Sequence, residues 1–244
     1  MWNFNGFVSH YNFNKMNIIY PFLIVILFAS CHNKEKQVTH WPEASLPAIA
    51  PILDYDSCKR EIATVKQQNK KGWTRLSLLQ KEKIFTAAVA KTIIPGWIGT
   101  AWDFNGVTET PGKGKIACGY FVTTVLRDAG LPITRIKLAQ CASEQMITTL
   151  VQSKFVQRFS NLPIDDFINA VKAKGYGLYL VGLDNHTGFI YNDGTAVYFI
   201  HSTFVGTRNV QQELAAASWV LAKSRYKVLG KISADEKVLN KWME

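Results

Sequence analysis

Residues 186–202 constrain the fold most, because they form two β-prone runs separated by a strong turn signal. The segment reads HTGFIYNDGTAVYFIHS, and Asp193-Gly194 is a dipeptide typical of a two-residue hairpin turn. A turn centred there places His186 directly opposite His201, and opposed residues of an antiparallel pair share one face. The sequence therefore predicts two imidazole rings side by side on one face of a sheet.

Cys118 lies at the expected start of a helix. It follows the Gly- and Lys-rich residues 112–117 and precedes an apolar run with helical spacing, which ends at Gly130-Leu131-Pro132. The unpaired N–H groups and the dipole of a helix N-terminus favour a thiolate and can stabilise an oxyanion. A cysteine in this position, followed along the chain by a histidine that begins a strand, is typical of papain-like cysteine hydrolases.

Several segments, taken in order, resemble the NlpC/P60 family of cell-wall cysteine peptidases. That family reads D-C-S-G, then H-V-G-I-Y, then F-I-H-A after a short turn. The matching segments here are residues 98–106, 117–120, 127–130, 186–191 and 198–202. Ala117 and Gly119 replace the family's Asp and Ser, and Trp102 stands where a Tyr is usual. Since that Asp and Ser help to recognise a muropeptide amine, the resemblance implies the nucleophile and the base but not the usual substrate preference.

The resemblance implies an α+β fold of the papain-like NlpC/P60 type, with N-terminal helices packed on a small antiparallel β-sheet. Cys118 would be the nucleophile, His186 the general base, and His201 the residue that orients His186. Trp102, Asp103 and Gly119 are expected near the substrate and the oxyanion, and Asp184 is an alternative group for tuning charge. The reaction would be hydrolysis of an amide bond, in a peptidoglycan stem peptide or another peptide, by a monomer that needs no cofactor.

Three other interpretations stay open. The altered residues around Cys118 also suit an inactive member of the fold that binds the cell wall or a protein partner. Cys118 and two histidines could supply three zinc ligands, although no paired-ligand spacing supports a metal site. An acyltransferase or lipid-handling relative is the third possibility, but in the permuted versions of this architecture the histidine precedes the cysteine.

The first residues resemble a bacterial lipoprotein leader. An apolar run from residue 18 to residue 28 follows Lys15, and it is shorter than the ~20 residues of a membrane span. Residues 27–31 read LFASC and resemble a lipobox, which predicts that Cys31 is lipidated. We expect a leader and signal peptide over 1–30, a tether over 31–53 and the hydrolase domain over 54–244, with its core at about 80–205. A plain membrane anchor is the alternative to lipidation.

Charge and cysteine usage fit an exported protein. The formal net charge is +10 and the pI is near 9.4, but no dense arginine block with interleaved aromatic residues suggests nucleic acid. We therefore expect no nucleic-acid partner, and a lipid-anchored location in the bacterial envelope, at the outer membrane or the periplasmic face. Cys58 and Cys141 could form a disulfide there or could remain free.

The remaining elements are predicted from periodicity and from turn signals. Helices are expected over 54–71, 77–94, 143–156, 162–173 and 210–223, the second of them ended by Pro95-Gly96. Strands are expected over 177–183 and 225–232, with residues 99–114 as a loop. Helices that precede strands in this way indicate an α+β domain.

Overall fold

The computed structural model describes residues 54–244. The α-helices are α1 (Tyr55–Lys70), α2 (Leu78–Ala87), α3 (Ile94–Trp97), α4 (Cys118–Asp128), α5 (Arg135–Ala139), α6 (Ser143–Leu150), α7 (Ile164–Ala173), α8 (Trp219–Lys223) and α9 (Glu236–Met243). Single turns η1 (Trp73–Arg75), η3 (Ser153–Phe155), η4 (Ala215–Ala217) and η5 (Ile232–Ala234), and a π-helical segment η2 (Ala88–Ile93), complete the helical elements.

The strands form one large sheet and one short pair. The large sheet has the order β3-β8-β4-β5-β6-β7, and every neighbouring pair in it is antiparallel. Its strands are β3 (Val156–Ser160), β4 (Gly177–Leu183), β5 (Thr187–Asn192), β6 (Val197–Ser202), β7 (Val210–Leu214) and β8 (Tyr226–Gly230). The short parallel pair is β1 (Ala101–Trp102) with β2 (Lys115–Ile116). The predicted α+β class with an antiparallel sheet is therefore confirmed.

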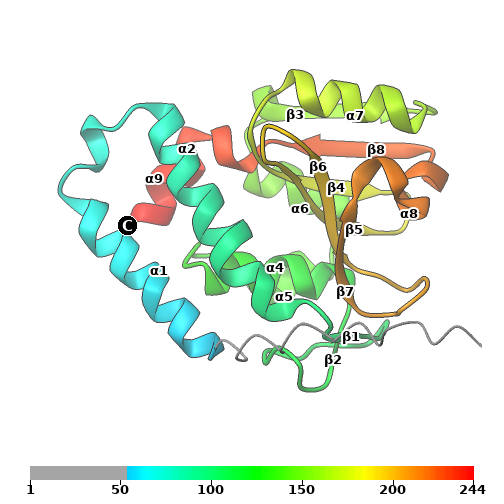
Figure 1. Cartoon of the computed structure of the whole chain (residues 1–244), viewed down its shortest axis with the longest axis horizontal. Coiled ribbons are helices and arrows are strands. Elements are labelled where there is room, and N and C mark those ends of the chain that lie inside the picture. The colour runs from blue at the N-terminus through cyan, green and yellow to red at the C-terminus, as the bar shows by residue number, and fades with distance from the viewer. Residues whose placement is uncertain (1–53) are drawn as a thin grey trace, which may run out of the picture. The chain divides into compact units, whose positions relative to one another are not determined.

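Helices cover both faces of the large sheet (Figure 1). On one face, Leu180 and Phe189 belong to a core that includes residues of α1, α2, α4, α6 and α9. On the other face, Tyr179 and Ile190 pack with apolar residues of α7. Successive residues of a strand point to opposite faces, so a strand with a helical layer on each side has no solvent-facing side. This explains why every residue of β4 is buried.

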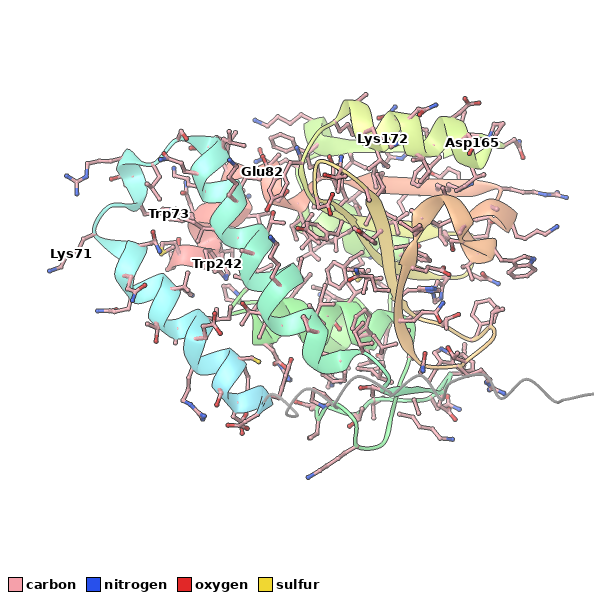
Figure 2. The ribbon with its side chains drawn as sticks, in the orientation of Figure 1. Lys71, Trp73, Glu82, Asp165, Lys172 and Trp242 are labelled. Atoms are coloured by element: carbon pink, nitrogen blue, oxygen red, sulfur yellow. The ribbon has the colours of Figure 1, made fainter. Side chains whose placement is uncertain are left out.

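The helical layer is closed by aromatic contacts between the first and last parts of the domain. Trp73 and Trp242 lie 5.9 Å apart between ring centroids, and Figure 2 shows both side chains among α1, α2 and α9. Phe85 meets Trp242 edge to face at 5.3 Å. Trp242 also donates from Nε1 to the carbonyl oxygen of Ala129, just after α4, at 2.6 Å. The last helix thus holds the C-terminal end of α4 in place.

Two predicted helices have different limits in the structure. The predicted helix over 77–94 is α2 followed by the π-helical segment and α3, and Pro95 lies inside the first turn of α3 instead of ending the helix. The π-helical segment immediately precedes Pro95, and a widened turn of this kind is a site where a helix accommodates a proline, which donates no backbone hydrogen bond. The predicted helix over 143–156 ends at Leu150, and β3 begins at Val156.

The prediction of a helix over 210–223 is wrong. Residues 210–214 form β7, which pairs with β6 at the edge of the sheet, and only Trp219–Lys223 is α-helical. The pairing with β6 is a long-range contact that local helix propensity does not report. The predicted loop over 99–114 also contains the short strand β1.

The hairpin between β5 and β6 forms, but its register differs from the prediction. Asn192 pairs with Val197, and Asp193 accepts from the N–H groups of Thr195 and Ala196 through its side chain. The chain therefore turns at Gly194-Thr195, and Gly194 has a φ of 95°, a value that favours glycine. Because the partner of Asn192 moves from residue 195 to residue 197, every side chain keeps its predicted face.

The predicted leader, tether and lipidation at Cys31 lie outside the described residues. Within residues 54–244, no helix is long and apolar enough to cross a membrane.

Candidate active site

Cys118 is the first residue of α4, as the sequence predicts. The preceding Ala117 is the N-cap residue and has no side chain that could cap the helix. The helix is fixed in the core by its apolar residues, and Phe121, Val122, Val125 and Leu126 are all fully buried. The backbone N–H groups at the start of α4 are therefore left to face the thiol and whatever binds beside it.

Two hydrogen bonds fix the chain that leads into α4. Ser202 Oγ, at the end of β6, donates to the carbonyl oxygen of Ile116 at 2.7 Å, and Ala117 N donates to the carbonyl oxygen of Gly106 at 2.8 Å. Since Ser202 follows His201 and Ile116 is two residues before Cys118, the first bond holds the strand of the second histidine against the segment of the nucleophile.

The two histidines lie side by side and are buried. His186 Nε2 is 2.8 Å from His201 Nδ1, and the two side chains are 3% and 0% exposed. They are diagonal neighbours and not directly opposed, because the observed register places Gly188 across from His201. A Cβ atom on Gly188 would lie 2.9 Å from the Cβ of His201 and 2.7 Å from the carbonyl oxygen of Ile200. Because glycine has no Cβ atom, the backbone at residue 188 does not clash with the His201 side chain.

Glu213 completes the line of polar groups from the far side of His201. Its Oε1 lies 3.2 Å from His201 Nε2, and β7 also brings the amide of Gln211 to 3.5 Å from the same nitrogen. Burial raises the pKa of Glu213, but hydrogen bonds from His201 and Ser218 oppose it, and the pKa lies below its usual value. The carboxyl group is therefore ionised and can only accept hydrogen bonds.

The charge on Glu213 decides which nitrogen atoms carry hydrogen. His201 Nε2 must carry a hydrogen to donate to the carboxylate, so Nδ1 of the neutral ring is an acceptor. His186 Nε2 must then donate to it, which leaves His186 Nδ1 with a lone pair. That atom has no hydrogen-bond partner among the described residues. Among residues 54–244, Thr86 Oγ1 is the only polar side-chain atom that is both fully buried and without a hydrogen-bond partner. His186 Nδ1, which also has no partner there, is therefore not fully buried. The site thus presents one basic nitrogen.

The thiol of Cys118 and the imidazole of His186 are both neutral at rest. Burial raises the pKa of the Cys118 thiol, although the N–H groups of Thr187, Gly119 and Cys118 oppose the increase. Burial, with a smaller contribution from the neighbouring His201 ring, lowers the pKa of His186 to about 3. Burial also lowers the pKa of His201, against the hydrogen bond and charge of Glu213. The helix N-terminus alone favours a thiolate, but desolvation outweighs it here, so the resting pair is a thiol and an imidazole.

The thiol and the first imidazole lie between two cavities. Cys118 and His186 line both a polar cavity of about 450 Å³ and a more apolar cavity of about 620 Å³. The polar cavity includes Glu144, Asp184 and Tyr226. The apolar cavity includes Trp102, Phe104, Val107, Tyr120 and Phe204. A ligand bound beside Cys118 can therefore extend in two directions.

The remaining predicted residues have different positions. Trp102 lines the apolar cavity, and Gly119 lines both cavities. Asp103 lines neither of these two cavities, and its carboxylate accepts from the N–H of Asn105 at 2.9 Å and pairs with Lys115 at 3.3 Å. Asp184 borders the polar cavity, but its carboxylate accepts from the backbone N–H groups at the start of β8, at 2.7 Å from Arg225. Both aspartates thus have structural partners.

Gly119 is required by packing. A Cβ atom built on it would lie 2.5 Å from the carbonyl oxygen of Ala139, and real Cβ atoms do not approach that closely. The C-terminal end of α5 therefore packs too tightly against α4 for a serine at this position. The departure from that pattern at residue 119 has a steric cause in this chain.

The described cysteines are free. Cys58 is buried in α1, and Cys141 donates from Sγ to the carbonyl oxygen of Leu138 at 3.2 Å, so the disulfide between them is absent from the structure. Within residues 54–244, no three His, Cys, Asp or Glu side chains are arranged to hold a metal ion.

Glu213 is the residue that sequence reasoning missed. It lies in the segment that was predicted to be helical, where its side chain would not face His201. Only a weak sequence signal marks it. Gln211 and Glu213 are two residues apart, which is the period of one face of a strand, but the strand has only five residues.

No family model matches the chain, and no curated protein or solved structure has significant similarity to it.

Proposed function

We propose that the protein is a cysteine hydrolase that cleaves an amide bond, with Cys118 as nucleophile and His186 as general base. The observation that supports this best is the line of hydrogen-bonded groups from Glu213 through His201 to His186, which ends at a cleft that also holds Cys118. An acidic group, an orienting ring and a base in series beside a nucleophile is the arrangement that nucleophilic catalysis requires.

The proposed reaction begins with attack of Cys118 Sγ on the carbonyl carbon while the thiol proton passes to His186 Nδ1. The backbone N–H of Cys118 at the N-terminus of α4 is one donor for the resulting oxyanion. His186 then returns the proton to the leaving amine, and the C–N bond breaks to leave a thioester. Water, deprotonated by the same nitrogen, hydrolyses the thioester and restores the thiol.

His201 and Glu213 would act through His186. When His186 takes the thiol proton, its Nε2–H still donates to His201, and the negative charge of Glu213 stabilises the imidazolium across the second ring. This support matters because burial of the His186 ring disfavours its charged form. The imidazolium would therefore be a transient state that forms during attack.

The papain-like NlpC/P60 fold type and the cell envelope belong to the same proposal. The order of a helix-borne cysteine followed by a histidine hairpin supports them, together with the lipobox-like residues before Cys31. A peptidoglycan stem peptide is then the first substrate to test, and lipid on Cys31 would hold the enzyme at the membrane.

A second candidate is a binding protein of the same fold without turnover. The buried thiol with a raised pKa, and the replacement of the family's Asp and Ser by Ala117 and Gly119, favour it. Purified full-length protein, incubated with muropeptides and analysed by mass spectrometry, separates the two candidates. Products that require Cys118 and survive Cys58→Ala support the hydrolase. Products that also appear with Cys118→Ala, or from neither protein, would refute hydrolysis of that substrate.

A further inference from the structure

The apolar cavity beside Cys118 is lined by side chains that are unusually exposed for their type. Phe104 is 80% exposed, Val107 is 52% exposed and Phe204 is 36% exposed. Single exposed apolar residues are common on proteins, but a contiguous group of them marks a binding surface. Here the group surrounds the proposed nucleophile, in a cavity of about 620 Å³.

Two aromatic residues of this cavity, Trp102 and Phe204, are held by contacts with their neighbours. Phe204 lies 5.6 Å from the ring centroid of His186 and 6.0 Å from that of Trp102. Trp102 is covered by the guanidinium group of Arg208 at 5.0 Å, and its backbone N–H donates to the Arg208 carbonyl oxygen at 2.8 Å. The loop of Phe204 is itself fixed, since Thr203 N donates to the carbonyl oxygen of Asn209 at 2.9 Å. The part of the aromatic wall that Trp102 and Phe204 form is therefore in place before any ligand binds.

The cavity on the other side of Cys118 has a different character. Its wall includes Glu144, which pairs with Arg158 at 2.6 Å and accepts from the hydroxyl of Tyr226 at 2.9 Å. Ser143 and Asp184 add further polar atoms to that wall. The two cavities thus differ: the wall of the smaller one mixes polar and apolar groups, whereas the wall of the larger one is mostly apolar.

We propose that the cavity between Trp102, Phe104 and Phe204 is a subsite for an apolar, aromatic group of the substrate next to the scissile amide. Rigid aromatic walls bind a flat apolar group through burial and edge-to-face contacts, at little cost in ordering. Val107 and Tyr120 extend the apolar lining, and Asn105 and Gln140 at its rim can bind the backbone of a peptide.

This inference rests on the proposed hydrolase function and narrows its substrate class. Peptidoglycan stem peptides are rich in charged and small side chains, which gain little from an aromatic wall. The preferred substrate would instead be a peptide, or another amide, with an aromatic group beside the bond that is cut. Turnover of stem peptides would then be slower than that of such an amide.

The test measures binding, so that it does not depend on the reactivity of the thiol. Full-length Cys118→Ala protein is titrated with N-acetyl-para-fluorophenylalanine amide and followed by fluorine NMR. We expect saturable binding that unlabelled N-acetylphenylalanine amide reverses, and that N-acetylglutamine amide reverses at least about tenfold less well. The Phe204→Ala and Phe104→Ala changes should each weaken binding by about tenfold.

Ile136→Ala is the matched control, because Ile136 is 57% exposed but does not line the cavity. It should leave the binding curve unchanged. The subsite is refuted if the fluorinated ligand does not bind, if the glutamine compound competes equally, or if Ile136→Ala weakens binding as much as Phe204→Ala. The hydrolase proposal fails separately, when the wild-type protein shows no turnover of aromatic amides or muropeptides that depends on Cys118.

Discussion

Glu213 Oε1 lies 3.2 Å from His201 Nε2, on the side of that ring opposite to His186. A carboxylate in this position sets the hydrogen positions of two successive rings. The lone pair on His186 Nδ1, which the proposed mechanism uses, therefore depends on a side chain on the far side of His201.

Replacing Glu213 with Gln should reduce kcat/KM by roughly 100-fold or more. The Gln amide can donate to His201 Nε2, which would reverse both tautomers and place a hydrogen on His186 Nδ1, as a carboxylate-to-amide change does in other triads. Nitrogen NMR of the imidazole rings measures this tautomer change directly. Gln212→Ala, at an exposed residue of the same strand, is the control. A Glu213→Gln protein with unchanged tautomers and activity would contradict the assignment.

The resting thiol should be protonated at neutral pH. Burial raises the pKa of Cys118 above its ordinary value of 9.0, so the ultraviolet absorbance of the thiolate should be missing at pH 7. We expect the absorbance difference between wild type and Cys118→Ala to appear only above pH 9. A difference already present at pH 6 would instead indicate a preformed thiolate–imidazolium pair, and it should then disappear in His186→Gln.

The free energy of unfolding should fall as the pH is lowered below about 6.5. Burial lowers the pKa of His186 from 6.5 to about 3 in the folded protein, so between these values only the unfolded chain binds the proton. Protonation of this one group then lowers the free energy of unfolding by up to ~1.4 kcal/mol for each pH unit that the pH falls within this window. Urea unfolding at several pH values measures the slope. His186→Gln should make the slope shallower, and an unchanged slope would show that His186 ionises in the folded protein.

Restoring the family's serine at residue 119 should destabilise the protein. The new Cβ atom would meet the carbonyl oxygen of Ala139, and overpacking of this kind costs about 1–3 kcal/mol. Ala117→Ser is the matched change, because residue 117 is an N-cap without a side-chain hydrogen bond, and a serine there should stabilise α4 by about 1 kcal/mol. Thermal unfolding compares the two; equal midpoints would contradict the packing argument.

The sequence alone predicts the parts of the site that depend on local patterns. The start of α4 at Cys118 follows from a Gly-rich segment before an apolar helical repeat. The shared face of His186 and His201 follows from the period of a strand, and it survives the shifted turn because the shift is by an even number of residues. Sequence periodicity does not show which strands pair with one another in the sheet.

Two of the features that periodicity misses depend on contacts between distant segments, and the third depends on a local side-chain contact. β7 becomes a strand because β6 offers it an edge, and that pairing alone brings Glu213 to His201. The side chain of Asp193 moves the turn by capping two N–H groups. The thiol stays protonated because the surrounding layers remove water from it, an effect that helix propensity and helix polarity do not include.

The bond from Ser202 to Ile116 joins residues that are 86 positions apart in the chain. A fragment that contains α4 alone would carry the sulfur atom with no base, and a fragment with the hairpin alone would carry the base with nothing to activate. Under the proposed mechanism, chemical competence would therefore require the sheet and the helical layer to be packed together. A newly made or partly unfolded chain would be inert, and its capacity to react would report on completed folding.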